Sequence, residues 1–91
     1  MEIKINNHTY EVIKNEKDAI DNEVLEEKIT EYYDDFDYIF GDWAYGKLRL
    51  KGFNDKGNKN FKPINDYKNT DIYIKDYCAF GCRHFILKKK S

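Results

Sequence analysis

Hydrophobic and charged residues alternate strictly near the centre of the chain. In the run 47–51 two leucines alternate with three cations: Lys47, Leu48, Arg49, Leu50 and Lys51. Alternation with period 2 is typical of a β-strand with one buried and one polar face. A second β-prone run precedes it, and Gly46 between the two can adopt the positive φ of a tight turn. We therefore expect a hairpin with strands at about 37–43 and 47–53.

The two ends of the chain also show β-strand patterns. The runs 2–5 and 9–13 are short and β-prone, and the asparagine pair at 6–7 between them tolerates positive φ, so they predict an opening hairpin. The run 82–88 near the carboxyl end predicts a last strand. Together with the central hairpin, these segments predict about five strands.

A hydrophobic stripe with helical spacing follows the first hairpin. Its members recur at i, i+4, i+7, i+8 and i+11: Leu25, Ile29, Tyr32, Tyr33 and Phe36. Asp21 is a good N-cap for this helix. Asp34 and Asp35 would oppose the negative end of the helix dipole. We therefore expect the helix to end near Tyr33 or Asp34.

The segment after the central hairpin predicts a loop and then a second helix. Residues 54–62 are polar with Gly57 at their centre, which is typical of an exposed loop that tolerates insertion. A helix is expected over much of 66–79, where Tyr73 and Tyr77 are spaced i, i+4 and Gly81 supplies a left-handed stop. The first residue of this helix is left open, because several polar residues could cap it.

The order ββαββαβ predicts an α+β fold. We expect two layers, with a mainly antiparallel sheet of about five strands and both helices on one face. A length of 91 residues allows a single domain over 1–91. The 8 tyrosines, 6 phenylalanines and 1 tryptophan suggest that rings fill much of the interior. The expected core residues are Leu25, Ile29, Leu48, Leu50, Tyr73, Tyr77, Phe85 and Leu87.

Charge is distributed unevenly along the chain. Up to Tyr45 there are 4 lysines and 13 acidic residues, whereas from Gly46 onward there are 12 Lys or Arg and 4 aspartates, giving −9 and +8. No apolar run approaches the roughly 20 residues that span a bilayer, and the first residues lack a signal-peptide pattern. We therefore expect a cytoplasmic monomer that does not bind a membrane.

Catalytic or metal chemistry has weak support in the residue pattern. Cys78 and Cys82 are spaced neither as a redox Cys-x-x-Cys pair nor as half of a four-ligand zinc site. We expect both to be reduced thiols that pack as small apolar groups. We assign no catalytic residue, no metal ligand and no cofactor. The alternative is a small thiol- or metal-dependent enzyme that uses the Cys78, Cys82 and His84 region, with Asp42 as a general base.

The cations of the central hairpin are the strongest functional signal. They could form a solvated strand face or pair with the acidic first helix; alternatively, they could contact phosphates while neighbouring rings stack on unpaired bases. The favoured hypothesis is a non-catalytic interaction module that binds a protein or RNA, and salt-dependent binding would indicate RNA. The candidate binding residues are Asp42, Trp43, Tyr45, Lys47, Arg49 and Lys51.

Two long motifs carry a family resemblance. The first covers 38–53 and includes Tyr38, Ile39, Gly41, Asp42, Trp43, Tyr45, Gly46, Leu48, Arg49, Leu50, Lys51, Gly52 and Phe53. The second covers 77–88 and includes Tyr77, Cys78, Phe80, Gly81, Cys82, Phe85, Leu87 and Lys88. With these motifs the chain closely resembles the YutD-like family of small bacterial proteins. The resemblance implies one compact cytoplasmic YutD-like domain of about this length, and it implies no mechanism.

Overall fold

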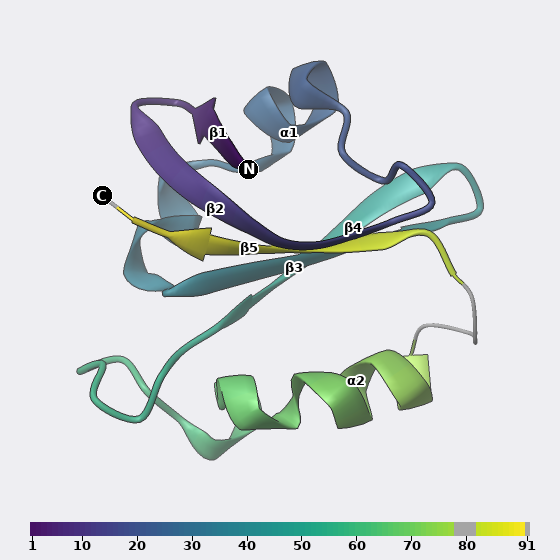
Figure 1. The fold of residues 1–91 in the computed structure, drawn as a ribbon. Coiled ribbons are helices and arrows are strands. Elements are labelled where there is room, and N and C mark those ends of the chain that lie inside the picture. Colours follow the sequence, from purple (N-terminus) through teal and green to yellow (C-terminus); the bar gives the residue numbers. More distant parts are fainter. Residues whose placement is uncertain (78–81, 91) are drawn as a thin grey trace.

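The computed structural model describes residues 1–77 and 82–90 and has the expected α+β class (Figure 1). A five-stranded sheet, antiparallel throughout, is combined with two α-helices and three short 3-10 helices. The strands are β1 (Glu2–Ile5), β2 (His8–Glu16), β3 (Tyr38–Ala44), β4 (Lys47–Phe53) and β5 (His84–Lys89). The helices are α1 (Asn22–Lys28), η1 (Glu31–Asp35), η2 (Pro63–Asn65), η3 (Tyr67–Asn69) and α2 (Thr70–Tyr77).

The last strand joins the two hairpins into one sheet. The strand order is β1-β2-β5-β3-β4, so β5 pairs with β2 on one side and with β3 on the other. Both predicted hairpins are present, β1–β2 and β3–β4. As a result β1 and β4 form the two edges of the sheet, and β4 is the longer of the two.

The helices cover opposite faces of the sheet, where the sequence predicted one face (Figure 1). One core cluster contains Leu25 of α1 together with Leu48 and Phe85. The other contains Phe40, and Tyr73 of α2 packs against it. Strands β3 and β5 are buried on both faces, since consecutive residues along each of them are buried. Such strands require cover on each side, which gives three layers instead of two.

The first helix is shorter than predicted. It ends at Lys28 with Ile29 as C-cap, and η1 follows after a break. Asn6, from the β1–β2 turn, donates hydrogen bonds to the carbonyls of Glu26 and Ile29 at 2.9 Å each, which satisfies the end of the helix there. The later residues of the predicted stripe therefore leave the core, and Tyr32 is 68% exposed.

Most of the expected core is confirmed. The residues with almost no exposure are Leu25, Ile29, Leu48, Phe85 and Leu87. Leu50 and Tyr73 are half-buried and pack at the margins of the two clusters. Tyr77 belongs to α2, and its side chain is not described; the predicted helix end at 78–79 and the Gly81 stop lie outside the described residues.

The segment after β4 is tied down more firmly than the predicted exposed loop. Asn54 is fully buried, and its side-chain oxygen accepts hydrogen bonds from the backbone N–H of Asp37 (2.8 Å) and from the Asn58 amide (3.1 Å). Its backbone pairs with Asp66 in an isolated parallel bridge. The polar composition of this segment gave no sign of a buried asparagine, because Asp37, which lies 17 residues away, takes part in its hydrogen bonding.

The described helices are all short. Within residues 1–77 and 82–90, none is long and apolar enough to cross a membrane.

Candidate functional site

The β3–β4 hairpin carries all six candidate binding residues. Ala44 pairs with Lys47, so the loop consists of Tyr45 and Gly46 alone, with φ of 54° and 74°. Positive φ at both loop residues is the geometry of a type I′ turn, in which glycine or asparagine is usual. Gly46 was predicted for this turn, and Tyr45 occupies the other left-handed position with its side chain fully exposed.

Lys47, Arg49 and Lys51, called here the β4 cations, share one face of the edge strand. This face is on the α2 side, because Lys51 Nζ lies 5.8 Å from the ring centroid of Tyr73 in α2 and 5.4 Å from that of Phe53. Lys47 and Arg49 are exposed, and Lys51 is half-buried. The β4 cations therefore do not form a fully solvated strand face, because α2 lies over Lys51.

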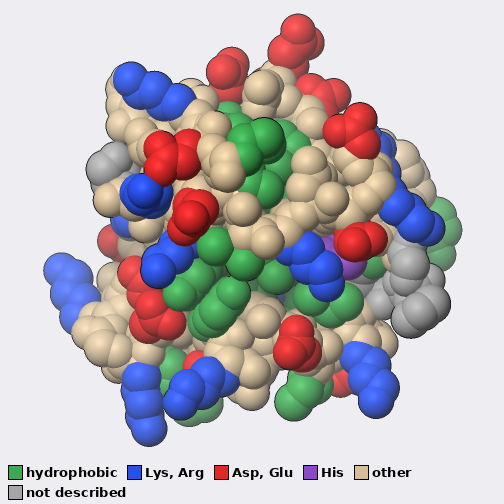
Figure 2. Space-filling model, viewed as in Figure 1, with side chains coloured by type: hydrophobic (Ala, Val, Ile, Leu, Met, Phe, Trp, Pro, Cys, Tyr) green, Lys and Arg blue, Asp and Glu red, His purple; other side chains and the backbone are tan. Residues whose placement is uncertain are grey.

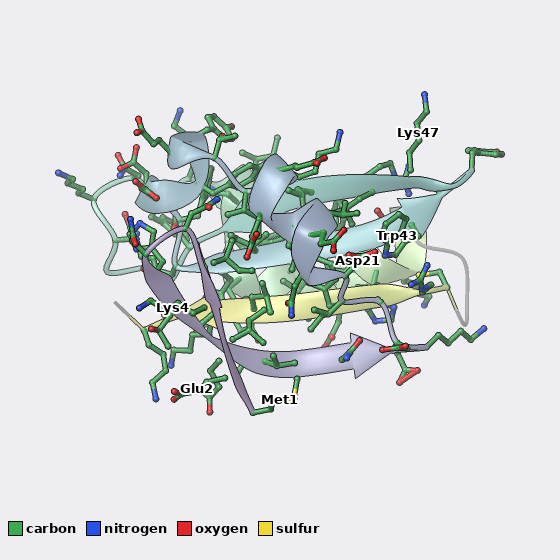
Figure 3. The ribbon with its side chains drawn as sticks, turned by 90° about the horizontal axis from the view of Figure 1, so that it is seen from above. Met1, Glu2, Lys4, Asp21, Trp43 and Lys47 are labelled. Carbon is green, nitrogen blue, oxygen red and sulfur yellow. The ribbon has the colours of Figure 1, made fainter. Side chains whose placement is uncertain are left out.

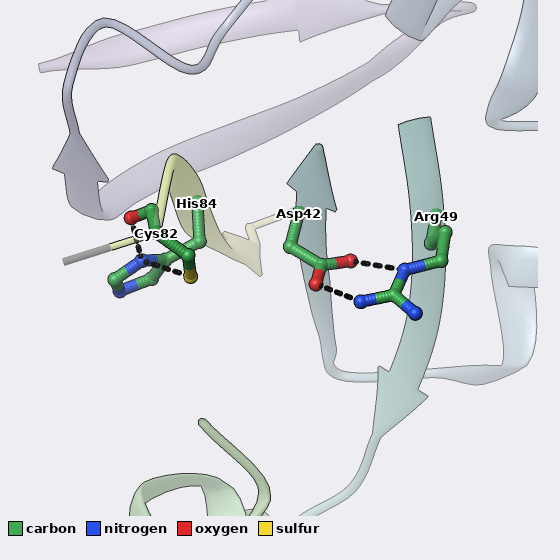
Figure 4. Close-up of polar contacts among 4 residues, drawn as sticks. All are labelled: Asp42, Arg49, Cys82 and His84. Carbon is green, nitrogen blue, oxygen red and sulfur yellow. Dashed lines mark hydrogen bonds and ion pairs between the residues drawn. The ribbon is translucent and has the colours of Figure 1, made fainter. Parts of the chain in front are cut away.

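Arg49 is held by Asp42, the residue directly opposite it on β3 (Figure 4). The guanidinium donates from Nε to Oδ1 at 3.1 Å and from a terminal nitrogen to Oδ2 at 2.5 Å. Asp42 is only 3% exposed, and its hydrogen bonds and charge raise the pKa of Arg49. The Arg49 charge is thus compensated inside the fold, although about half of its side chain remains exposed.

Trp43 lies on the opposite face of the sheet from the β4 cations. Its indole N–H donates to the carbonyl of Ala19 at 2.8 Å, and the guanidinium of Arg83 lies 4.8 Å from its ring centroid. Figure 3 shows Trp43 near Asp21 on the α1 side, while Lys47 extends past the edge of the sheet. The indole and the cations therefore do not form one surface, as the candidate site required. Period-2 alternation could have shown this, because Asp42 faces Arg49 in the ladder and Trp43, the next residue, must point to the other face.

The Cys82 and His84 region has a different geometry from that expected of reduced thiols. Cys82 is disulfide-bonded, so the expectation of a thiol at this position is wrong; Cys78 lies outside the described residues. His84 is 4% exposed, and its Nδ1 lies 2.9 Å from the Cys82 carbonyl and 3.4 Å from its sulfur (Figure 4). The Nδ1–H therefore donates to that carbonyl, which sets the tautomer. A disulfide sulfur is not a thiolate nucleophile, so this geometry gives the thiol-enzyme alternative no support.

Histidines and acidic residues elsewhere form isolated contacts. His8 Nε2 lies 2.9 Å from a carboxylate oxygen of Asp34. His84 is opposite Asp42 in the sheet, and the Asp42 carboxylate is bonded to Arg49. Within 1–77 and 82–90, no three His, Cys, Asp or Glu side chains are grouped closely enough to hold a metal ion.

A groove of about 620 Å³ lies along β4 and was not foreseen from the sequence. Tyr33 and Phe36 line one side, Lys62 and Tyr73 line the other, and Leu50 is on the strand between them. Beside it is a second depression of about 400 Å³, lined in part by two exposed isoleucines, Ile64 and Ile72. No local sequence signal could place this groove, because it depends on β4 being an edge strand. On the face seen in Figure 2, hydrophobic side chains are visible between the sheet and the α2 layer.

Known proteins resemble this chain over almost its full length. A family model described as "YutD-like: Putative antitoxin YutD-like" matches residues 4–88. A Bacillus subtilis (strain 168) protein named "Putative antitoxin YutD" is 40% identical over 87 residues, which are 96% of each chain. A solution NMR structure of protein yutD from B. subtilis aligns with a TM-score of 0.79 at 39% identity, covering 99% of this chain and 82% of that one. These matches include both hairpins and the last strand.

Proposed function

The chain belongs to the YutD-like family, and from this premise we propose that it is a non-catalytic interaction module that binds a protein partner through the β3–β4 hairpin. The family description and the B. subtilis relative both carry the words "Putative antitoxin" in their names. For this chain, the proposal is that the partner is a protein whose activity falls when the hairpin binds it. A cytoplasmic location and a monomeric state are part of the same proposal.

The conformation of Tyr45 is the observation that carries this proposal. A fully exposed tyrosine sits at a left-handed turn position where asparagine or glycine would fit with less strain. Strained residues that persist in a fold cluster at binding sites. Exposed Lys47 follows it on the same hairpin, and tyrosine is enriched among the residues that dominate binding energy.

RNA is the less favoured partner on present geometry. The hypothesis for RNA combined cations with an accessible indole for base stacking. Trp43 lies on the other face of the sheet, bonded to Ala19 and covered by Arg83. The rings near Lys51 belong to Phe53 and Tyr73, and Phe53 is buried. With Tyr45 as one exposed ring, the cations could bind phosphates but would stack few bases, which favours a protein surface.

Affinity capture from cell lysate tests the proposal when wild type and a hairpin variant are compared. The variant combines Tyr45→Asn, which suits the turn, with Lys47→Glu, which reverses an exposed charge without touching the Asp42 pair. We expect the captured partner to fall by about tenfold or more, because both changes remove groups at the proposed contact. The matched control is Lys4→Glu, an exposed lysine on the other edge strand.

Three results would decide between the hypotheses. Loss of the partner with the hairpin variant, and not with Lys4→Glu, supports the proposal if the partner survives nuclease treatment. A partner that disappears on nuclease treatment would favour RNA. Equal capture by the wild type and the hairpin variant would show that the β3–β4 hairpin is not the binding surface.

A further inference from the structure

The outer edge of β4 presents unpaired backbone groups. In an antiparallel ladder, residue pairs that exchange hydrogen bonds alternate with pairs that do not. Ala44 and Lys47 close a two-residue loop and form a bonded pair, so the next bonded pair is Asp42 with Arg49. The residues between the bonded pairs are Leu48, Leu50 and Gly52. Their backbone N–H and C=O groups therefore point away from β3.

Three observed hydrogen bonds confirm this alternation. The N–H of Trp43, which is opposite Leu48, donates to the carbonyl of Arg83 on the β5 side at 3.0 Å. At the far end, the N–H of Asn54 donates outward to the carbonyl of Asn65 at 2.7 Å, and its own carbonyl accepts from Tyr67 at 3.0 Å. The chain itself therefore pairs with this edge for one residue and then leaves it.

The remaining outward groups of β4 face no other strand of the sheet, and Gly52, although buried, lines the groove. Within the described residues, the outward N–H and C=O of Leu48, Leu50 and Gly52 have no hydrogen-bond partner. The 620 Å³ groove follows the edge at Leu50 and Gly52, with Phe36 packed over Gly52. The edge of a seven-residue strand with no neighbouring strand on its outer side is a template for pairing with an added strand.

The two sides of the edge differ in chemistry, which selects the added strand. On the α2 side are the β4 cations, and Lys62 also lines the groove. On the α1 side are Leu50, Tyr33 and Phe36, with Asp35 as an acidic residue of the groove lining. Since side chains alternate between faces, a fitting strand has acidic residues at every second position and apolar residues between them.

A second copy of this chain would fit poorly. Pairing β4 with β4 of another molecule would place one set of β4 cations beside the other on the same face, and like charges on facing strands are destabilising. The charge on the edge thus disfavours self-association while leaving an acidic strand acceptable.

We infer that the partner binds by adding an extended segment of alternating acidic and apolar residues to β4 as a sixth strand. Main-chain hydrogen bonds to Leu48, Leu50 and Gly52 would hold the segment, while its acidic side chains meet Lys47 and Lys51. This inference rests on the proposed function, since it specifies how the protein partner contacts the same hairpin.

The test uses a capped seven-residue peptide in which glutamate alternates with valine, matching the length of β4. Amide hydrogen exchange is followed by NMR with and without the peptide. We expect slower exchange at Leu48, Leu50 and Gly52 in the complex, because their N–H groups gain acceptors. The N–H groups of Lys47, Arg49 and Lys51 are already bonded to β3 and should change less.

Two control peptides and one pair of variants sharpen the test. A peptide with lysine in place of glutamate, and one with the glutamates grouped at one end, should each bind at least about tenfold more weakly. Leu50→Pro removes an outward N–H without breaking the β3 ladder, whereas Leu50→Val keeps it. We expect the proline variant to lose peptide binding and the valine variant to retain most of it.

The failure of this inference can be told apart from the failure of the proposed function. No binding of the alternating peptide, equal binding of the grouped peptide, or unchanged exchange at the three outward amides would overturn strand addition. If strand addition failed but the Tyr45→Asn/Lys47→Glu variant still lost the lysate partner, the proposed function would stand without strand addition. If Leu50→Pro does not fold, the amide exchange of the wild type with and without the peptide decides by itself whether strand addition occurs.

Discussion

Arg49 donates two hydrogen bonds from its guanidinium to the carboxylate of Asp42, which faces it across the β3–β4 ladder. The carboxylate is buried at 3% exposure, so the arginine acts as its counter-ion. One of the three β4 cations is therefore a structural residue, and charge reversal there would test folding before it tested binding.

Charge reversal should separate the structural cation from the exposed one. Arg49→Glu leaves two carboxylates facing each other, so we expect a thermal midpoint several degrees below that of Lys47→Glu. The double variant Asp42→Asn/Arg49→Gln should recover part of the loss, because no buried charge is left unpaired. Thermal denaturation followed by circular dichroism checks both. Equal thermal midpoints for the two single variants would mean that the Asp42–Arg49 ion pair contributes nothing to stability.

Gly41 lies against a buried ring that has no room to move. A Cβ at this position would be 2.2 Å from Cζ of Phe85, which is fully buried. Gly41→Ala should therefore lower the free energy of unfolding by about 3 kcal/mol through overpacking. Gly57→Ala is the control, since no atom lies within 4 Å of its Cβ position, and it should change stability by less than about 1 kcal/mol. Urea denaturation would measure both, and similar values for the two variants would contradict the packing.

Asn54 connects the segment after β4 to the start of β3. Removing its side chain in Asn54→Ala leaves the backbone N–H of Asp37 without its acceptor, so we expect a loss of roughly 1–3 kcal/mol in unfolding free energy. Asn69→Ala, an exposed asparagine bonded to the Pro63 carbonyl, should cost less. If Asn54→Ala were as stable as Asn69→Ala in urea denaturation, the buried network would be unimportant.

Tyr38 should make the protein sensitive to alkaline pH. Burial, followed by the charge of Asp55, raises the pKa of Tyr38 from 10 to about 12, and its hydroxyl donates to Asp55 at 3.2 Å. A folded-state pKa above the unfolded value means that the folded state keeps the proton more strongly. The stability contribution is therefore complete below pH 10 and is lost as pH rises through about 12.

The change Tyr38→Phe tests this directly. The variant removes the titrating group, so its unfolding free energy should fall less steeply between about pH 10 and pH 12 than that of the wild type. In an absorbance titration of the folded protein, the variant should lack the tyrosinate signal that the wild type gains near pH 12. Parallel stability profiles for the two proteins would exclude a contribution from this group.

The sequence alone was sufficient to predict the strands and the residues of the β3–β4 hairpin. Period-2 alternation identified β4, and the need for positive φ at Gly46 located its turn. These features depend on neighbours within a few residues, where backbone sterics and side-chain period act directly. The same alternation placed Leu48 in the core and the cations on the other face.

Tertiary structure decided what surrounds that hairpin. The length of α1 depends on Asn6, which reaches its end from another turn, and the buried state of Asn54 depends on Asp37. Arg49 is neutralised, and Trp43 separated from the cations, only through pairing across the sheet.

The edge position of β4 and its groove arise because β5, the last strand of the chain, inserts between the two hairpins. Pairing between residues this distant in sequence leaves no local pattern, since the free energy that selects it comes from burying both faces of β3 and β5 at once.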